Sequence, residues 1–89
     1  MIGYFARSIA GHDKGQLYIV VGYEDNKVCL SDGRLKRVEQ PKKKNKKHIQ
    51  IISRDCGFEL DEMIKRGDKA INEAVKRAIK LYEREEKNV

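Results

Sequence analysis

Short apolar runs separated by turn residues fill the chain up to about residue 53. Five segments cluster or alternate apolar residues over about 4 to 8 positions, as strands do; they are residues 4–9, 16–23, 27–30, 35–38 and 49–52. Asp25-Asn26 and Asp32-Gly33 lie between consecutive segments and suit tight hairpin turns, which require a positive φ. Five short strands joined in this way predict a small β-barrel rather than an open sheet.

After residue 58 the spacing of apolar residues along the chain becomes that of a helix. A stripe at spacings of three and four predicts an amphipathic helix, and its members are Ile71, Ala74, Val75, Ala78, Leu81 and Tyr82. Asp68 after Gly67 is the expected N-cap, and Leu60, Met63 and Ile64 suit one helical turn that ends at Gly67. The predicted fold class is mostly β with a C-terminal helix. Residues 1–55 form the barrel, and residues 56–89 form a helical extension packed on it as part of one structural unit.

Length and composition narrow the function classes. A chain of 89 residues suits one domain, and with 38% charged residues and a mean hydropathy of -0.74 its core is small. A large catalytic cleft would compete with that core for apolar residues, so we expect no enzyme. No apolar run is long enough to span a bilayer, and residues 1–4 lack a secretory leader, so we expect a cytoplasmic protein. There Cys29 and Cys56 would stay reduced and serve as packing residues.

Positive charge is concentrated in the first part of the chain. The net charge is +6 and the pI is about 9.4, which favours a polyanionic partner, either nucleic acid or an acidic membrane surface. Residues 1–55 carry 12 Lys and Arg against 6 Asp and Glu, whereas residues 56–89 carry 8 of each. Between Arg34 and Arg54 there are nine basic residues against Glu39 alone. This stretch is therefore the main candidate for binding.

The densest basic segment lies between two predicted strands, at residues 40–48. Its lysines repel one another, so an ordered loop that carries them favours a polyanion as partner; they are Lys42, Lys43, Lys44, Lys46 and Lys47. A solvated charge run and a nuclear-import-like address remain as alternatives. Arg34 and Arg37 add planar guanidinium groups for bidentate contacts to phosphate. Tyr4, Phe5, Tyr18 and Tyr23 are candidates for base stacking, although aromatics in a small barrel also form core.

Signals for metals, cofactors and catalysis are weak. His12 and His48 share no ligand spacing with a cysteine or a carboxylate pair. Gly11 and Gly15 do not match a nucleotide-binding fingerprint, which requires a strand before and a helix after the glycines, whereas strands are predicted on both sides here. We therefore expect neither a metal nor a cofactor.

The segment from Gly3 to Gly22 resembles a KOW motif, the strand, glycine-containing loop and strand of certain ribosomal proteins and transcription elongation factors. Residues 30–38, with the Asp-Gly-Arg turn, and residues 41–48, from Pro41 to His48, extend the resemblance. Together they look like the KOW-domain RNA-binding proteins related to the archaeal and eukaryotic large-subunit ribosomal protein L-fourteen-e. The resemblance covers residues 2–52 well and the helical tail loosely.

This resemblance implies an SH3-like β-barrel that binds structured RNA, in the first place rRNA, without catalysis. Gly11, Asp13 and Gly15 would shape the KOW loop, and His12 stands where we expect arginine in the family. The RNA-binding residues would be Arg7, His12, Lys14, Arg34, Lys36, Arg37, Lys42, Lys43, Lys44, Lys46, Lys47 and His48. We expect a ribosomal or ribosome-associated protein, a monomer when free, with ribosomal proteins as further neighbours. The alternative is a protein-interaction module of the transcription or translation machinery.

Overall fold

Residues 2–87, which the computed structural model describes, form five strands, one 3-10 turn and two α-helices. Residue 1 of the predicted barrel and residues 88–89 of the predicted extension lie outside this range. The strands are β1 (Tyr4–Ser8), β2 (Leu17–Glu24), β3 (Lys27–Ser31), β4 (Lys42–Asn45) and β5 (Ile49–Asp55). The helical elements are the 3-10 turn η1 (Lys46–His48), α1 (Leu60–Lys65) and α2 (Ile71–Lys87).

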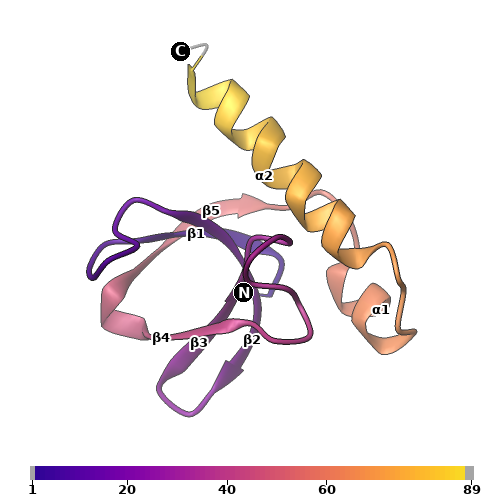
Figure 1. Cartoon of the computed structure of the whole chain (residues 1–89), viewed down its shortest axis with the longest axis horizontal. Coiled ribbons are helices and arrows are strands. Elements are labelled where there is room, and N and C mark those ends of the chain that lie inside the picture. The colour runs from indigo at the N-terminus through magenta and orange to yellow at the C-terminus, as the bar shows by residue number, and fades with distance from the viewer. Residues whose placement is uncertain (1, 88–89) are drawn as a thin grey trace.

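The strands form one antiparallel sheet in the order β4-β3-β2-β1-β5 (Figure 1). β2 lies at the centre and is buried along Leu17 to Val21, because an unbroken apolar run offers apolar side chains to both faces of a sheet. Val20 pairs with Leu30 and Gly22 pairs with Cys29. Val21 is therefore an extra residue on β2, and such a bulge increases the bend and twist of a strand.

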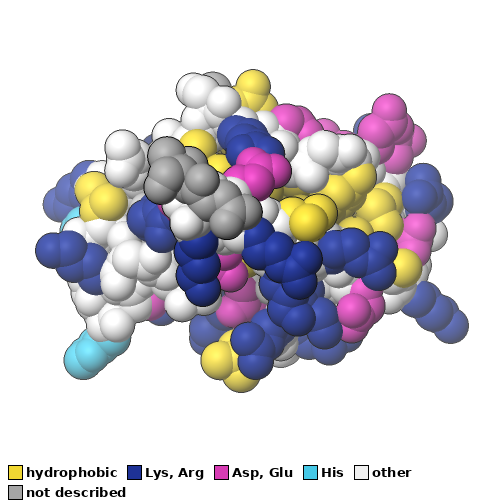
Figure 2. Space-filling model, turned by 90° about the horizontal axis from the view of Figure 1, so that it is seen from above, with side chains coloured by type: hydrophobic (Ala, Val, Ile, Leu, Met, Phe, Trp, Pro, Cys, Tyr) yellow, Lys and Arg dark blue, Asp and Glu magenta, His cyan; other side chains and the backbone are white. Residues whose placement is uncertain are grey.

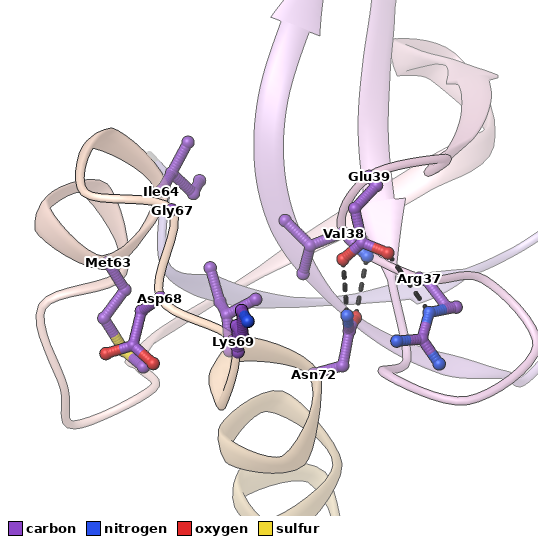
Figure 3. A pocket seen from close by; sticks show the side chains of 10 residues that line it. Arg37, Val38, Glu39, Met63, Ile64, Gly67, Asp68, Lys69 and Asn72 are labelled. Carbon is purple, nitrogen blue, oxygen red and sulfur yellow. Dashed lines mark hydrogen bonds and ion pairs between the residues drawn. The ribbon is translucent and has the colours of Figure 1, made fainter.

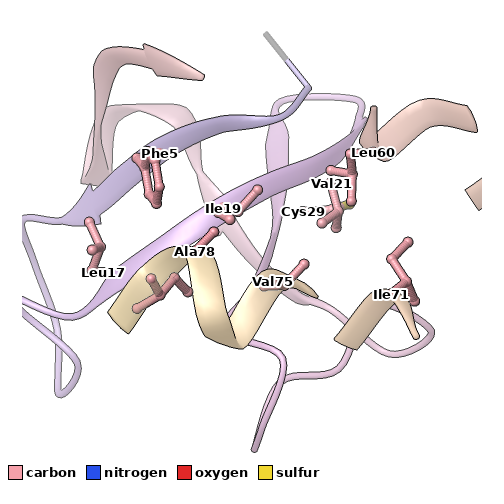
Figure 4. Packing of buried hydrophobic residues seen from close by; sticks show 10 residues of the cluster. Phe5, Leu17, Ile19, Val21, Cys29, Leu60, Ile71, Val75 and Ala78 are labelled. Atoms are coloured by element: carbon pink, nitrogen blue, oxygen red, sulfur yellow. The ribbon is translucent and has the colours of Figure 1, made fainter. Parts of the chain in front are cut away.

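Two groups of buried side chains occupy the two faces of the sheet. The face toward α2 carries Phe5, Ile19 and Val21, which pack against apolar side chains of the helix (Figure 4). The other face carries a second group that consists of Ala6, Tyr18, Val20, Val28, Leu30 and Ile49. Alternate residues of β2 enter different groups, as the period of two of a strand requires. The sheet is thus covered by α2 on one side and curls around its own apolar side chains on the other.

α2 confirms the predicted C-terminal helix and packs along the sheet through a stripe centred on Val75, which is fully buried. Leu81 was predicted to belong to this stripe, and that prediction is wrong: the residue is 51% exposed, and Ile79 is buried instead. At 100° per residue Leu81 lies about 120° from Val75 around the helix, while Ile79 lies about 40° away. Asp68 lies three residues before the first residue of α2 and accepts a hydrogen bond from the Ala70 N–H at 2.8 Å, so it caps the turn that leads into the helix rather than the helix itself.

Four of the five predicted strands are confirmed, and the strand predicted at residues 35–38 is wrong. After β3 the chain turns, because Asp32 Oδ1 accepts hydrogen bonds from the N–H groups of Arg34 and Lys36, both at 2.9 Å. Leu35 lies at the tip of this loop and is 87% exposed. The strand that pairs with β3 on the side away from β2 is the lysine-rich β4. The sheet is not closed into a barrel, since β4 and β5 are its two edges and are joined through η1 (Figure 1).

Candidate nucleic-acid interface

Asp13, a residue of the loop between β1 and β2, is the centre of a polar network. Ser8 Oγ donates a hydrogen bond to Asp13 Oδ1 at 2.8 Å, and the Tyr18 hydroxyl donates to Oδ2 at 2.7 Å. Lys44 Nζ lies 2.6 Å from Oδ1 and Lys42 Nζ lies 3.2 Å from Oδ2. The Asp13 side chain is only 14% exposed. Its carboxylate therefore connects β1, β2 and β4 at the point where the loop leaves the sheet.

The protonation of this network follows from its donors. Burial by itself would raise the pKa of Asp13, but the hydrogen bonds from Lys44, Tyr18, Ser8 and Lys42 outweigh it and hold that pKa well below its ordinary value. Burial raises the pKa of Tyr18, and the hydrogen bond to the charged Asp13 raises it further. At neutral pH Asp13 is consequently a carboxylate and Tyr18 a neutral phenol.

The loop that carries Asp13 is shaped by Gly11 and Gly15, whose φ angles are +88° and +92°. These angles lie in the left-handed region, which glycine adopts at little cost. The Gly15 N–H donates to Ser8 O at 2.8 Å, and the Gly15 carbonyl accepts from Arg7 at 2.9 Å. His12 and Lys14 are exposed on the loop. The loop is anchored at both ends and presents these two side chains to solvent.

The lysines of β4 alternate between the two faces of the sheet and are paired with carboxylates of the protein. Lys42 and Lys44 lie opposite Leu30 and Val28, on the face of the second apolar group, and their ammonium groups reach Asp13. Lys44 also donates to Ala10 O at 2.6 Å and is 11% exposed. Lys43 pairs with Glu24 at 2.8 Å, which raises the pKa of Lys43 and lowers that of Glu24. Three of the predicted phosphate contacts are therefore already paired with carboxylates.

The remaining basic residues of this region gather around η1, which lies between the β1–β2 loop and the β2–β3 turn. The Ile9 N–H donates to His48 O at 2.9 Å on one side, and the Lys46 N–H donates to Asn26 O at 3.2 Å on the other. We call the outer side of these segments the η1 surface, and it consists of His12, Lys14, Tyr23, Lys27, Lys46, Lys47 and His48. None of its four lysines has a carboxylate of residues 2–87 within ion-pair distance.

Among the aromatic candidates, only Tyr23 is strongly exposed, at 43%. Phe5 and Tyr18 are buried in the two apolar groups, and Tyr4 is half-buried. The Lys46 ammonium lies 5.7 Å from the centre of the Tyr23 ring, within the range of a cation–π contact. Tyr23 thus places an accessible aromatic ring beside a cation on the η1 surface, where an unpaired base can stack.

Other predicted RNA-binding residues lie apart from this surface. Arg7 donates to Glu86 of α2 at 2.8 Å and so ties β1 to the helix. Arg34, Lys36 and Arg37 follow β3, whereas the η1 lysines follow β4, and these strands run in opposite directions. The two groups therefore lie at opposite ends of the strand pair, at least roughly 10 Å apart at about 3.3 Å per residue. The sequence predicted one continuous basic segment, and the structure divides it.

The loop that carries Arg34 to Arg37 is held on α2 by Asn72, a buried polar residue that sequence reasoning missed. Asn72 Oδ1 accepts the Val38 N–H at 2.8 Å, and Asn72 Nδ2 donates to Glu39 at 2.5 Å (Figure 3). Arg37 pairs with Glu39 at 3.1 Å. Asn72 interrupts the apolar stripe of the predicted helix, and a polar residue at such a position is the signal that a buried partner is required.

Lys27 of the η1 surface was also missed, because it lies outside the basic segment of the sequence. Lys27 pairs across the sheet with Asn45, the last residue of β4. The correct placement of β4 beside β3 would have revealed the residue.

The described residues 2–87 contain no group of three or more His, Cys, Asp or Glu residues placed to bind a metal ion. No helix within the same range is long and apolar enough to cross a membrane. No protein-family model matches the chain, and no curated protein matches it at a significant level.

Proposed function

We propose that this chain is an RNA-binding protein of the translation apparatus, ribosomal or ribosome-associated, and that its η1 surface binds the backbone of structured RNA, in the first place rRNA. The observation that carries this proposal is the distribution of paired and unpaired charge. Asp13 and Glu24 are occupied by lysines of β4, and no carboxylate of residues 2–87 lies at ion-pair distance from the four lysines of the η1 surface. Unpaired lysines on an anchored surface favour phosphate as ligand.

The finer fold in this proposal is an SH3-like barrel with a KOW element. The strand order β4-β3-β2-β1-β5, the bulge on β2 and the 3-10 turn between β4 and β5 support it. So does the loop from Gly11 to Gly15, which lies between two paired strands as in the KOW resemblance. A rigid loop of this kind matches the shape of a folded RNA, whereas lysine contacts to phosphate carry no sequence information.

The electrostatic part of this proposal predicts how strongly salt weakens binding. Each lysine that contacts a phosphate contributes about -0.7 to -0.9 to the slope of log affinity against log salt concentration. Four such lysines therefore give a slope of roughly -3. Lys46→Gln/Lys47→Gln should make this slope less steep by roughly 1.4 to 1.8. The measurement is fluorescence anisotropy of a labelled short RNA hairpin at several salt concentrations.

Lys65→Gln/Lys69→Gln removes the same charge near α1 and is the matched control, which should keep the wild-type slope. If both double variants change the slope equally, binding depends on net charge alone and the η1 surface is not the site. A wild-type protein that does not bind the hairpin would contradict the proposed function itself.

A second candidate function, a protein-interaction module, is favoured by one observation. A cavity of about 410 Å³ opens between the 37–39 loop, α1 and the start of α2, with Val38, Met63, Ile64 and Ile71 among its lining residues (Figure 3). Co-purification before and after nuclease treatment distinguishes the two functions. An association through RNA disappears on treatment, while a protein bound in this cavity stays.

A further inference from the structure

The loop after β3 and the outward side of α2 form one rigid surface. Gly33 adopts a φ of +73° and packs so closely on the helix that a methyl group there would lie 2.3 Å from the Asn72 carbonyl oxygen. The Asn72 side chain then holds Val38 and Glu39, as described above. Because the loop has backbone contact and side-chain hydrogen bonds with α2, its cations keep a fixed position relative to those of the helix.

This surface carries unpaired positive charge. We call it the loop–helix surface, and it consists of Arg34, Leu35, Lys36, Arg77, Lys80, Arg84 and Lys87. Within residues 2–87 its six cations have no carboxylate at ion-pair distance. The acids nearby are occupied: Glu73 pairs with Lys76, Glu85 with Arg54 and Glu86 with Arg7. Of the carboxylates along α2, Glu83 alone has no ion pair with a described residue.

The helical cations run along the length of α2. From Arg77 to Lys87 the helix rises about 15 Å at ~1.5 Å per residue, enough to follow several phosphates. Seen from above, a group of Lys and Arg side chains lies in the middle of the molecule with some Asp and Glu side chains among them, and other Lys and Arg side chains lie at its left and right edges (Figure 2). In the view of Figure 1, η1 and α2 lie on opposite sides of the sheet. Between the two surfaces lies β4, whose three lysines are paired with Asp13 and Glu24 and so keep only one net positive charge.

We propose that the loop–helix surface binds a second segment of RNA backbone while the η1 surface holds the first, so that one chain bridges two RNA segments. This inference rests on the proposed function of the η1 surface. Two exposed leucines, Leu35 on the loop and Leu81 on α2, lie among these six cations, whereas the centre of a protein interface is enriched in apolar and aromatic side chains and depleted in charged ones. A surface on which unpaired cations outnumber apolar side chains in this way fits a nucleic-acid backbone better than a protein.

The test is a bridging assay with the full chain and two short RNA hairpins, one with a donor and one with an acceptor fluorophore. Energy transfer reports bridging, and anisotropy of one hairpin alone reports simple binding. Lys36→Gln/Lys80→Gln removes two cations of the loop–helix surface, and Lys65→Gln/Lys69→Gln is the charge-matched control. Circular dichroism shows that each variant is folded, and light scattering gives the composition of the bridged complex.

We expect wild type and control to bridge equally in a complex of one chain and two hairpins. Lys36→Gln/Lys80→Gln should lose most of the energy transfer while its affinity for one hairpin changes less than about twofold. Wild type that binds one hairpin without bridging, or equal loss in variant and control, overturns the inference and leaves the proposed function standing. A bridged complex with two protein chains overturns it as well.

Poly-glutamate separates RNA from an acidic protein as the ligand of the loop–helix surface. The two competitors, poly-glutamate and unlabelled single-stranded RNA, are compared at equal concentrations of negative charge. If poly-glutamate abolishes bridging where the RNA does not, the surface prefers an acidic polypeptide and the inference is wrong. We expect the unlabelled RNA to be the stronger competitor. Absence of any hairpin binding by wild type would instead contradict the proposed function, so the two failures are distinct.

Discussion

Replacing Asp13 by asparagine removes the charge toward which four donors converge. An amide keeps one acceptor oxygen but places an N–H₂ group against hydroxyl and ammonium donors, and Lys44 is left almost buried without a counter-charge. Loss of one partner of a buried pair costs about 3 to 5 kcal/mol, and hydrogen bonds to charged groups contribute about 1.5 to 3 kcal/mol each. Since Asp13 keeps some contact with water, we expect a loss of about 3 kcal/mol.

Thermal unfolding followed by circular dichroism measures this loss. For a domain of this size about 1 kcal/mol corresponds to about 4 to 8 °C, so Asp13→Asn should melt roughly 12 to 24 °C below wild type at pH 7. The difference should depend on pH. The folded-state pKa of Asp13 lies below its ordinary value, so its stabilisation is complete at neutral pH and is lost as pH falls below about 4. The two melting temperatures should therefore converge in acid.

Asp25→Asn is the matched control, because Asp25 is an exposed carboxylate with no ion pair among residues 2–87 and a φ of +54°, which asparagine tolerates. It should melt within about 2 °C of wild type. If Asp13→Asn also melts within that margin, or if its difference from wild type is the same at every pH, Asp13 does not hold the loop and β4 together. The assignment of Lys42 and Lys44 as structural lysines would then be wrong.

Two further substitutions test how the loop and the helix pack. Gly33→Ala should cost more than about 3 kcal/mol in a urea titration, because the new methyl group meets the Asn72 carbonyl oxygen; Gly15→Ala, which has open space, should cost only the roughly 1 to 2 kcal/mol of a left-handed φ. Val75→Asp buries an unpaired charge and should lower the free energy of unfolding by about 4 kcal/mol or more, whereas Arg77→Ala should change it by less than about 0.5 kcal/mol. If Gly33→Ala and Gly15→Ala lower the free energy of unfolding equally, the close packing of Gly33 on α2 is refuted. If Val75→Asp and Arg77→Ala do so, the burial of Val75 against the sheet is refuted.

The elements that the sequence predicts correctly are those that bury a regular pattern of apolar side chains. β2 carries an apolar run and α2 carries a stripe at helical spacing, and both patterns are visible without the structure. β4 has no apolar residue, so its pairing with β3 depends on Asp13, a residue about thirty positions earlier in the chain. Such a strand is determined by a distant partner, and local periodicity does not reveal it.

The candidate site was predictable as a region but not as a set of residues. A charge count treats Lys44 and Lys47 alike, although the first pairs with Asp13 and the second has no carboxylate partner among the described residues. Pairing depends on which acids the fold brings near, and Asp13 can pair with both Lys42 and Lys44 because they share a face of β4. Alternation within β4 provides this arrangement, but the segment first has to be identified as a strand.

A sheet edge made of lysines also affects how copies of this chain meet one another at high concentration. β4 is an edge strand of four residues, three of them lysine. An uncovered edge offers free N–H and C=O groups to which another strand can add, which is the first step of many aggregation processes, and lysine side chains on a short edge oppose it. Replacing Lys42 to Lys44 by β-branched residues would strengthen the strand's propensity and would also expose an edge that invites neighbouring chains.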